Sequence, residues 1–163
     1  LSSSQHITPL AKTKKSGRSR SESDEHYIID LCDHALGIEG SRQHTFDFLR
    51  GDPNDKGTRH KLRVDAYYQS LHLVIEFDEP QHTIANKHFD KPDEMTVSGV
   101  PRPEQRIIYD ERRFIELLQK GIQLVRFSYT QFECNGRKKL RRNAEKDLQV
   151  IKEILSRELK EKI

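Results

Sequence analysis

The chain has 163 residues, of which 34% are charged and 33% hydrophobic, and its formal net charge is +3. The charge is uneven: residues 1–20 carry five Lys or Arg and no acid, residues 137–163 carry ten against five acids, and the stretch between them has a net charge of −7. No apolar run reaches the roughly 18–20 residues of a membrane span, and no secretory signal opens the chain, so composition excludes a membrane protein and predicts one soluble cytoplasmic domain.

The first predicted elements are a basic flexible tail over residues 1–23 and a helix from about Glu25 to Leu36. The tail is rich in Ser, Lys and Arg and lacks periodicity, so it is either a DNA-contacting arm or a solvated linker. Because the chain starts with Leu rather than Met, it is read as a trimmed form or a piece of a longer protein. Ser23 or Asp24 can cap the helix and Gly37 can end it. Its apolar stripe comprises Ile28, Leu31, Cys32 and Leu36.

Three consecutive strands are predicted next, over residues 43–50, 61–69 and 72–78. The cluster GDPNDKG forms a turn between the first two, and a tight turn near Gln69 joins the second to the third. Because both links are short, the three strands are expected to form an antiparallel meander.

An irregular segment over residues 83–103 leads to a helix at 104–120 and an apolar strand at 122–128. A strand–helix–strand return predicts that this last strand lies parallel to a neighbour. A final helix is expected over residues 142–162. The helix at 104–120 is expected to turn its apolar residues inward, namely Ile107, Ile108, Phe114, Leu117 and Leu118. The order αβββαβα predicts an α/β or α+β fold with a mixed central sheet flanked by helices.

Acidic residues interrupt the second and third predicted strands. Asp65 lies in the second, and Glu76 and Asp78 lie two apart in the third, so these two share a face. A carboxylate in an apolar strand costs free energy unless a partner offsets it, and a divalent metal ion is the commonest partner of three that converge. The pattern therefore predicts a Mg²⁺ site, of the kind that hydrolyses phosphodiesters.

Other interpretations of these acids stay open. Asp65 could lie on the surface of an edge strand, Glu76 could pair with a buried arginine such as Arg126, and Asp78 could serve only a turn. Arg113 and Arg126 are expected to act as ion-pair partners rather than in catalysis. Cys32 and Cys134 form no C-x-x-C pair, so two free thiols in a reducing compartment are expected, without structural zinc.

The sequences VDAYY at 64–68 and LVIEFDEPQH at 73–82 resemble the PD-(D/E)XK nuclease superfamily. More narrowly, they resemble its branch of small nucleases related to very short patch repair endonucleases. Further matches follow in chain order over about residues 25–130: Glu25, Arg42 with Gln43, a D-x-x-R helix at Asp110 and Arg113, and then Gly121, Val125, Arg126 and Phe127. The resemblance implies a restriction-endonuclease-like fold for residues 24–163.

By this resemblance the chain is a Mg²⁺-dependent endonuclease that hydrolyses DNA, with Mn²⁺ as a substitute. Asp65, Glu76 and Asp78 are assigned to the metal. Gln81 and His82 join them in the catalytic set, for proton transfer or phosphate contact. The wider superfamily has lysine two residues after Glu76, where this chain has Asp78, as in the narrower branch.

Residues outside the acidic set receive supporting assignments. Glu25 and Gln43 are implied to support the metal ligands, although Glu25 could be a plain first-turn helix acid. A basic run is expected to contact the phosphates of double-stranded DNA, or else to be the solvated start of the last helix. It comprises Arg137, Lys138, Lys139, Arg141 and Arg142.

Two other functions compete with the DNA endonuclease. One is a catalytically inactive DNA-binding module that keeps the nuclease fold, which the absent lysine motivates. The other is an RNA-directed nuclease, since composition does not separate the two substrates. The expected setting is repair, restriction or mobile-element maintenance in a bacterium or phage. A homodimer is compatible with double-strand cutting.

Overall fold

The computed structural model describes residues 23–80 and 94–159. The predictions for the tail at 1–22, for Gln81 and His82 and for the last four residues fall outside this part of the chain. The elements follow the order α1 (Asp24–Leu36), β1 (Ser41–Arg50), β2 (Lys61–Tyr68), η2 (Gln69–Leu71), β3 (Leu73–Asp78), α3 (Arg102–Gln119), β4 (Gln123–Ser128), η3 (Tyr129–Gln131) and α4 (Ala144–Glu158).

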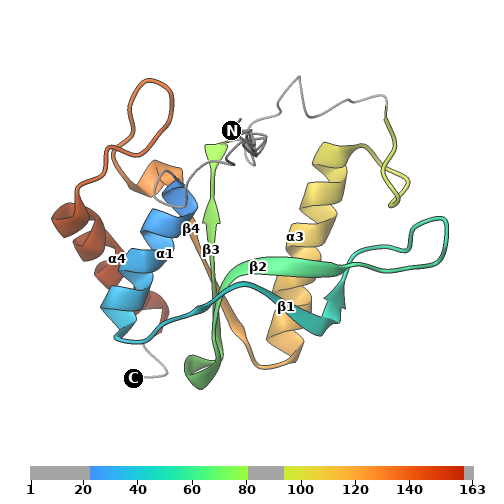
Figure 1. The fold of residues 1–163 in the computed structure, drawn as a ribbon, viewed down its shortest axis with the longest axis horizontal. Helices are drawn as coiled ribbons and strands as arrows, with labels where there is room; N and C mark the ends of the chain where they lie inside the picture. Colours follow the sequence, from blue (N-terminus) through green and yellow to red (C-terminus); the bar gives the residue numbers. More distant parts are fainter. Residues whose placement is uncertain (1–22, 81–93, 160–163) are drawn as a thin grey trace, which may run out of the picture.

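The four strands form one mixed sheet in the order β1-β2-β3-β4. β1 and β2 are antiparallel, as are β2 and β3, whereas β4 runs parallel to β3. The predicted meander and the predicted parallel return are both confirmed. Helices α1 and α4 lie together on one side of β3 and β4, and α3 lies on the other side (Figure 1). Over the residues that the structure describes, the fold is therefore α+β, with a four-stranded mixed sheet and the three helices α1, α3 and α4.

Helix α1 begins and ends where its sequence predicts. The Ser23 side chain accepts a hydrogen bond from the His26 N–H at 3.4 Å, and Gly37 ends the helix with φ of 69°. That left-handed conformation suits glycine because it has no Cβ. The apolar stripe of α1 packs inward, with Ile28 and Cys32 fully buried.

Alternation along β3 divides the buried apolar residues between the two faces of the sheet. Ile75 and Phe77 belong to the larger core, which α1 and α4 cover. Val74 belongs to the smaller cluster, to which α3 contributes Leu117 as its one buried residue. Apolar packing is therefore extensive under α1 and α4 and sparse under α3.

The predicted inward face of the helix at 104–120 is wrong for four of its five residues. Only Leu117 is buried, while Ile107, Ile108, Phe114 and Leu118 are 67%, 36%, 53% and 62% exposed. The physical reason is what lies beneath the helix. The sheet side presents charged groups and strand-end carbonyls, so α3 turns hydrogen-bond donors toward them and its apolar residues outward.

Polar contacts attach α3 to the chain between β1 and β2. The Arg112 guanidinium donates to the Asp52 carboxylate at 2.7 Å and to the Arg50 carbonyl at 3.1 Å. The Tyr109 hydroxyl accepts from the Asp52 N–H at 2.9 Å. Such contacts contribute less per residue than apolar burial does, but they fix which face of the helix points inward.

Helix α4 begins later than predicted, at Ala144, because Asn143 caps it and accepts a hydrogen bond from the Lys146 N–H at 3.1 Å. Its stripe of Ile151 and Leu155 packs into the main core as expected. None of the helices within residues 23–80 and 94–159 has the length and apolarity needed to cross a bilayer.

Candidate active site

Strands β2 and β3 separate at Asp65 and Glu76. Ala66 and Ile75 are the last pair in their register, which places Asp65 and Glu76 opposite each other at the next position. There the Phe77 N–H donates to the Asp65 carboxylate at 2.8 Å. The Asp65 carboxylate thus accepts the N–H that a backbone carbonyl of β2 would accept if the two strands stayed paired.

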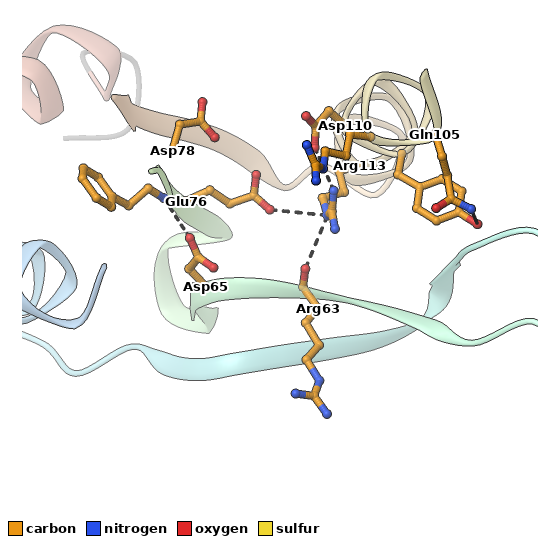
Figure 2. Close-up of a pocket in the computed structure, with 10 residues that line it drawn as sticks. Arg63, Asp65, Glu76, Asp78, Gln105, Asp110 and Arg113 are labelled. Atoms are coloured by element: carbon orange, nitrogen blue, oxygen red, sulfur yellow. Dashed lines mark hydrogen bonds and ion pairs between the residues drawn. The ribbon is translucent and has the colours of Figure 1, made fainter. Parts of the chain in front are cut away.

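The divergence opens a cavity of about 430 Å³ between β2, β3 and α3. The three predicted acids, Asp65, Glu76 and Asp78, all line it, and Figure 2 shows Glu76 between the other two. The remaining lining residues are Arg63, Phe77, Gln105, Arg106, Tyr109, Asp110 and Arg113. The cavity is therefore polar, with acids from the strands and cations from β2 and the inner face of α3.

Two arginines hold Glu76, whose side chain is nearly buried. Arg126 Nε lies 3.1 Å from Glu76 Oε2, and Arg113 Nε lies 3.5 Å from Oε1 (Figure 2 draws the Arg113 pair). Arg126 is the direct partner of Glu76 in the parallel register of β3 and β4. The expectation that Arg113 and Arg126 form ion pairs is confirmed. Burial raises the pKa of Glu76, and the two guanidinium groups partly oppose that shift.

Arg113 also fixes its own position by contacts around the cavity. Its Nη1 lies 2.8 Å from Asp110 Oδ1, and its Nε donates to the Arg63 carbonyl at 3.3 Å. The D-x-x-R spacing places Asp110 and Arg113 one turn apart on the same helix face. Arg113 is thereby tied to both β2 and β3 as they diverge.

Asp65 carries the clearest electrostatic imbalance in the cavity. Burial, with smaller contributions from the nearby Glu25 and Glu76 carboxylates, raises the pKa of its carboxyl to about 7, although the Phe77 N–H and Arg113 act in the opposite direction. The carboxylates of Asp65, Glu25 and Glu76 are therefore close together, and that of Asp65 loses its proton only at a raised pH. A cation placed among them would relieve both the repulsion and the lost hydration.

Glu25 and Gln43 lie next to each other behind Asp65. Gln43 Nε2 donates to Glu25 Oε1 at 2.8 Å. Gln43 has φ of 47°, uncommon for a residue other than glycine, and it falls opposite Asp65 in the β1–β2 register. The structure thus places both predicted supporting residues near Asp65, and their role at a metal stays a prediction.

The acids fit a hard cation in chemistry but not in their present arrangement. Within residues 23–80 and 94–159, no three His, Cys, Asp or Glu side chains are grouped closely enough to hold a metal ion. One reason is that Glu76 points toward its two arginines. Carboxylate oxygens are the ligands that Mg²⁺ prefers. The raised pKa of Asp65 shows that a nearby cation would stabilise its ionised form. To bind a metal ion, the Glu76 carboxylate would have to break at least one of its ion pairs with Arg113 and Arg126.

Sequence patterns single out Asp110 and Arg113 on α3 but not Gln105, Arg106 and Tyr109, which also line the cavity. Gln105, Tyr109 and Arg113 recur at intervals of four, so they share one face of the helix. That spacing was a detectable signal. It was overlooked because the apolar stripe on the opposite face is normally the one that packs inward.

The basic run lies in a turn before α4 rather than in the helix. We call residues 135–142 the basic turn. Cys134 and Leu140 pair across it, and Lys138 at its tip has φ of 59°. The Asn135 side chain accepts from the N–H groups of Arg137 and Lys139 at 2.9 and 3.1 Å. The backbone of the turn is thus well defined, and Arg137, Lys138 and Arg141 are exposed.

Arg142 differs from the rest of the run because it anchors the turn. Its Nη2 lies 3.1 Å from Asp24 Oδ1, and its guanidinium stacks 4.8 Å from the centroid of the Tyr27 ring. The Leu140 N–H donates to the other Asp24 oxygen at 3.2 Å. These contacts hold the basic turn at the start of α1, beside Glu25. Figure 1 shows it at the same end of the molecule as the carboxyl end of β3.

Comparisons with protein-family models, with curated proteins and with solved structures gave no match for this chain. The resemblance to the nuclease superfamily therefore stays a prediction, and functional argument depends on the site itself.

The raised pKa of Asp65 predicts that metal-free protein loses stability as pH rises. The folded state keeps a proton at Asp65 up to about pH 7, whereas the unfolded state loses it near 3.8, so the cost of ionisation grows between these values. In EDTA, the free energy of unfolding should fall across this window by about 2–4 kcal/mol more in the unaltered protein than in Asp65→Asn. Urea titrations at several pH values measure it. The exposed Asp55→Asn serves as control, and equal pH slopes for all three proteins would refute the assignment.

Proposed function

We propose that this chain is a metal-dependent nuclease that cuts DNA, with the cavity between β2, β3 and α3 as its active site. The observation that carries the proposal is the opposed pair Asp65 and Glu76 where two strands diverge, in a cavity that also presents arginines. Phosphodiester hydrolysis needs carboxylates for a divalent ion and cations for the phosphate, and the cavity offers both. Mg²⁺ is the proposed ion, and Mn²⁺ is its expected substitute.

Asp65 and Glu76 are the proposed ligands, with Asp78 as a third carboxylate from the same face of β3. Bound there, Mg²⁺ would supply Lewis-acid stabilisation of the phosphate and a lowered pKa for an attacking water. The carboxylates hold the ion and hydrogen-bond the water. Glu25, held by Gln43, would add a further carboxylate next to Asp65 in support of the ion.

Arg113 and Arg126 are proposed to supply the positive charge that Asp78 cannot. In the metal-free arrangement both guanidiniums are engaged with Glu76. If Glu76 turned to a bound ion, Arg113, which lines the cavity, would have donors available there for a phosphate oxygen, and Arg126 would stay beside Glu76 on β4. Guanidinium groups suit this exchange because their planar donor sets match carboxylate and phosphate alike.

Proton transfer is the remaining requirement of hydrolysis. Asp78 lines the cavity and can accept a hydrogen bond from the attacking water. Gln81 and His82 follow it in the chain, outside the described residues, and we keep them as proposed partners for proton transfer and phosphate contact.

The basic turn is proposed to bind the DNA backbone next to this site. Its exposed cations lie at the end of the molecule where β3 ends, so one duplex could contact both regions (Figure 1). Contacts of this kind position a duplex without reading its sequence.

A second candidate function is a DNA-binding module without catalysis. The double ion pair of Glu76 favours it, because two arginines already satisfy the carboxylate that a metal would need. The two candidates differ in one property, which is binding of a divalent ion that depends on Asp65 and Glu76.

Purified protein with Mg²⁺ should nick or linearise supercoiled plasmid, and Asp65→Asn or Glu76→Gln should lower the rate at least about 100-fold, because each removes a metal ligand. Asp55→Asn, an exposed acid outside the cavity, should cut normally. Comparing the cleavage rates of DNA and RNA duplexes of the same sequence establishes the preferred substrate. Cleavage that survives both cavity substitutions would refute the active site. Absence of cleavage and of calorimetric Mg²⁺ or Mn²⁺ binding, with DNA binding intact, would favour the binding module.

Arg113→Gln should lower kcat by about 100-fold with little change in KM, because the guanidinium acts on the charge that develops at phosphorus. Arg113→Lys should recover part of the rate. Arg112→Gln is the matched control, since the neighbouring guanidinium contacts Asp52 and the Arg50 carbonyl instead. Single-turnover kinetics below the melting temperature of each variant separate catalysis from stability. Equal losses in Arg113→Gln and Arg112→Gln would show that both arginines are only structural.

Replacing Arg137 and Lys138 together by Gln should weaken DNA binding and lower the slope of log Kd against log salt by about 1.8, at about 0.9 per phosphate contact. The control replaces Lys152 and Arg157, two exposed cations on α4, in the same way. Fluorescence anisotropy at several salt concentrations measures both. Identical slopes for the two double variants would place the DNA elsewhere.

A further inference from the structure

Helix α3 exposes an apolar stripe that nothing in the described part of the chain covers. Its members recur seven residues apart, at 107 and 114 and at 108 and 115, with one more at 118, so they follow one face along most of the helix. They are Ile107, Ile108, Phe114, Ile115 and Leu118, which are 67%, 36%, 53%, 43% and 62% exposed. Met95 and Val97, in the turn that leads into α3, are 65% and 54% exposed. Contiguous apolar surface of this kind marks an interaction site.

The stripe is nearly symmetric about Glu111. Ile107 and Ile115 lie four residues before and after it, and Ile108 and Phe114 lie three residues before and after it. A two-fold axis through Glu111, perpendicular to the helix, therefore places apolar residues of one α3 on apolar residues of an antiparallel copy. Such self-complementarity is what an isologous interface requires.

We propose that two copies of this chain associate through α3, antiparallel, about a two-fold axis at Glu111. Ile107 of each copy packs on Ile115 of the other, and Ile108 on Phe114. Leu118 reaches the far end of the partner helix, near the turn that contains Met95 and Val97. The proposal stands apart from the nuclease function, because it uses only the outer face of α3.

The exposed area is consistent with a weak dimer. At roughly 60–120 Å² for a fully exposed side chain of this size, seven side chains about half exposed present on the order of 300 Å² of apolar area. Because about 57% of a typical interface is apolar, each copy would bury on the order of 500 Å². Both copies together then bury on the order of 1,000 Å², below the roughly 1,200 Å² at which standard specific interfaces begin, so we expect a weak dimer with a dissociation constant of roughly micromolar size or larger.

Glu111 limits the strength of this dimer. Its exposed side chain and its symmetry mate meet at the axis, and like charges in contact repel. Glu111→Gln should therefore tighten association about tenfold or less. The axis also sets the relation of the two cavities. Since each cavity lies against the inner face of α3, the two face away from each other at opposite ends of the helix pair.

Sedimentation equilibrium between about 1 and 200 μM should show a monomer–dimer equilibrium in the unaltered protein. Phe114→Glu should weaken it at least tenfold while the far-ultraviolet circular dichroism stays native, because this side chain is half exposed. Lys152→Glu, which also introduces a glutamate at an exposed helix position but on α4, should leave it unaltered. A protein that stays monomeric at every concentration, or a dimer that Phe114→Glu leaves intact, would overturn the proposal.

Cross-linking tests the axis itself. With Cys134→Ser as background and the buried Cys32 retained, oxidised Glu111→Cys should form a disulfide dimer, because the two Cα atoms meet at the axis within bonding range. Gln119→Cys should not, since residues eight positions from the axis lie about 24 Å apart along antiparallel helices. Dimers from both variants would indicate parallel helices, and dimers from neither would indicate another surface. Either result would overturn the proposed arrangement.

Discussion

The buried carboxylate of Glu76 is the constraint on which the rest of this structure depends. An isolated charge in a sheet interior is costly, so positive charge must reach it from neighbouring elements. Arg126 does so from β4, where the parallel register puts it beside Glu76. Arg113 does so from α3. Glu76 thereby acts together with the contacts of Arg112 and Tyr109 at Asp52 to set which face of α3 points toward the sheet.

That choice of face explains the two unusual features of α3. The inner face is polar because it supplies Arg113 to Glu76 and Arg112 to Asp52. The apolar residues of the same helix are left on the outside, where a solitary domain leaves them in water. An ordinary amphipathic helix would bury them and contribute to the core. Here α3 gives only Leu117 to the buried apolar core, and its other apolar residues are those to which we assign the proposed contact with a second copy.

Sequence patterns predict most of the fold because alternation and turn residues are local signals. They locate the four strands of the described sheet, the pairing directions and the three acids that the strands contribute to the cavity. They fail on α3. Periodicity identifies the apolar face of a helix but not the surface against which the helix packs, and here that surface of the sheet carries the charged Glu76. They also extend the last helix into the basic turn, whose position depends on the contact between Arg142 and Asp24 across the fold. The raised pKa of Asp65 is equally non-local, since it follows from burial and from acids on other elements.

Asp78 connects the placement of the arginines with the position of α3. In the nuclease superfamily that the sequence resembles, the cation at this position belongs to the same strand as the acid. This chain has a carboxylate there, and the cations next to Glu76 come from β4 and α3. A basic side chain on a strand is positioned by the backbone hydrogen bonds of the sheet. A basic side chain on a helix is positioned only by the packing of that helix. In the proposed nuclease mechanism, the position of α3 therefore decides whether Arg113 can move from Glu76 to a phosphate. A second copy packed on the outer face of α3 would hold that helix in place, so assembly and site geometry depend on the same element.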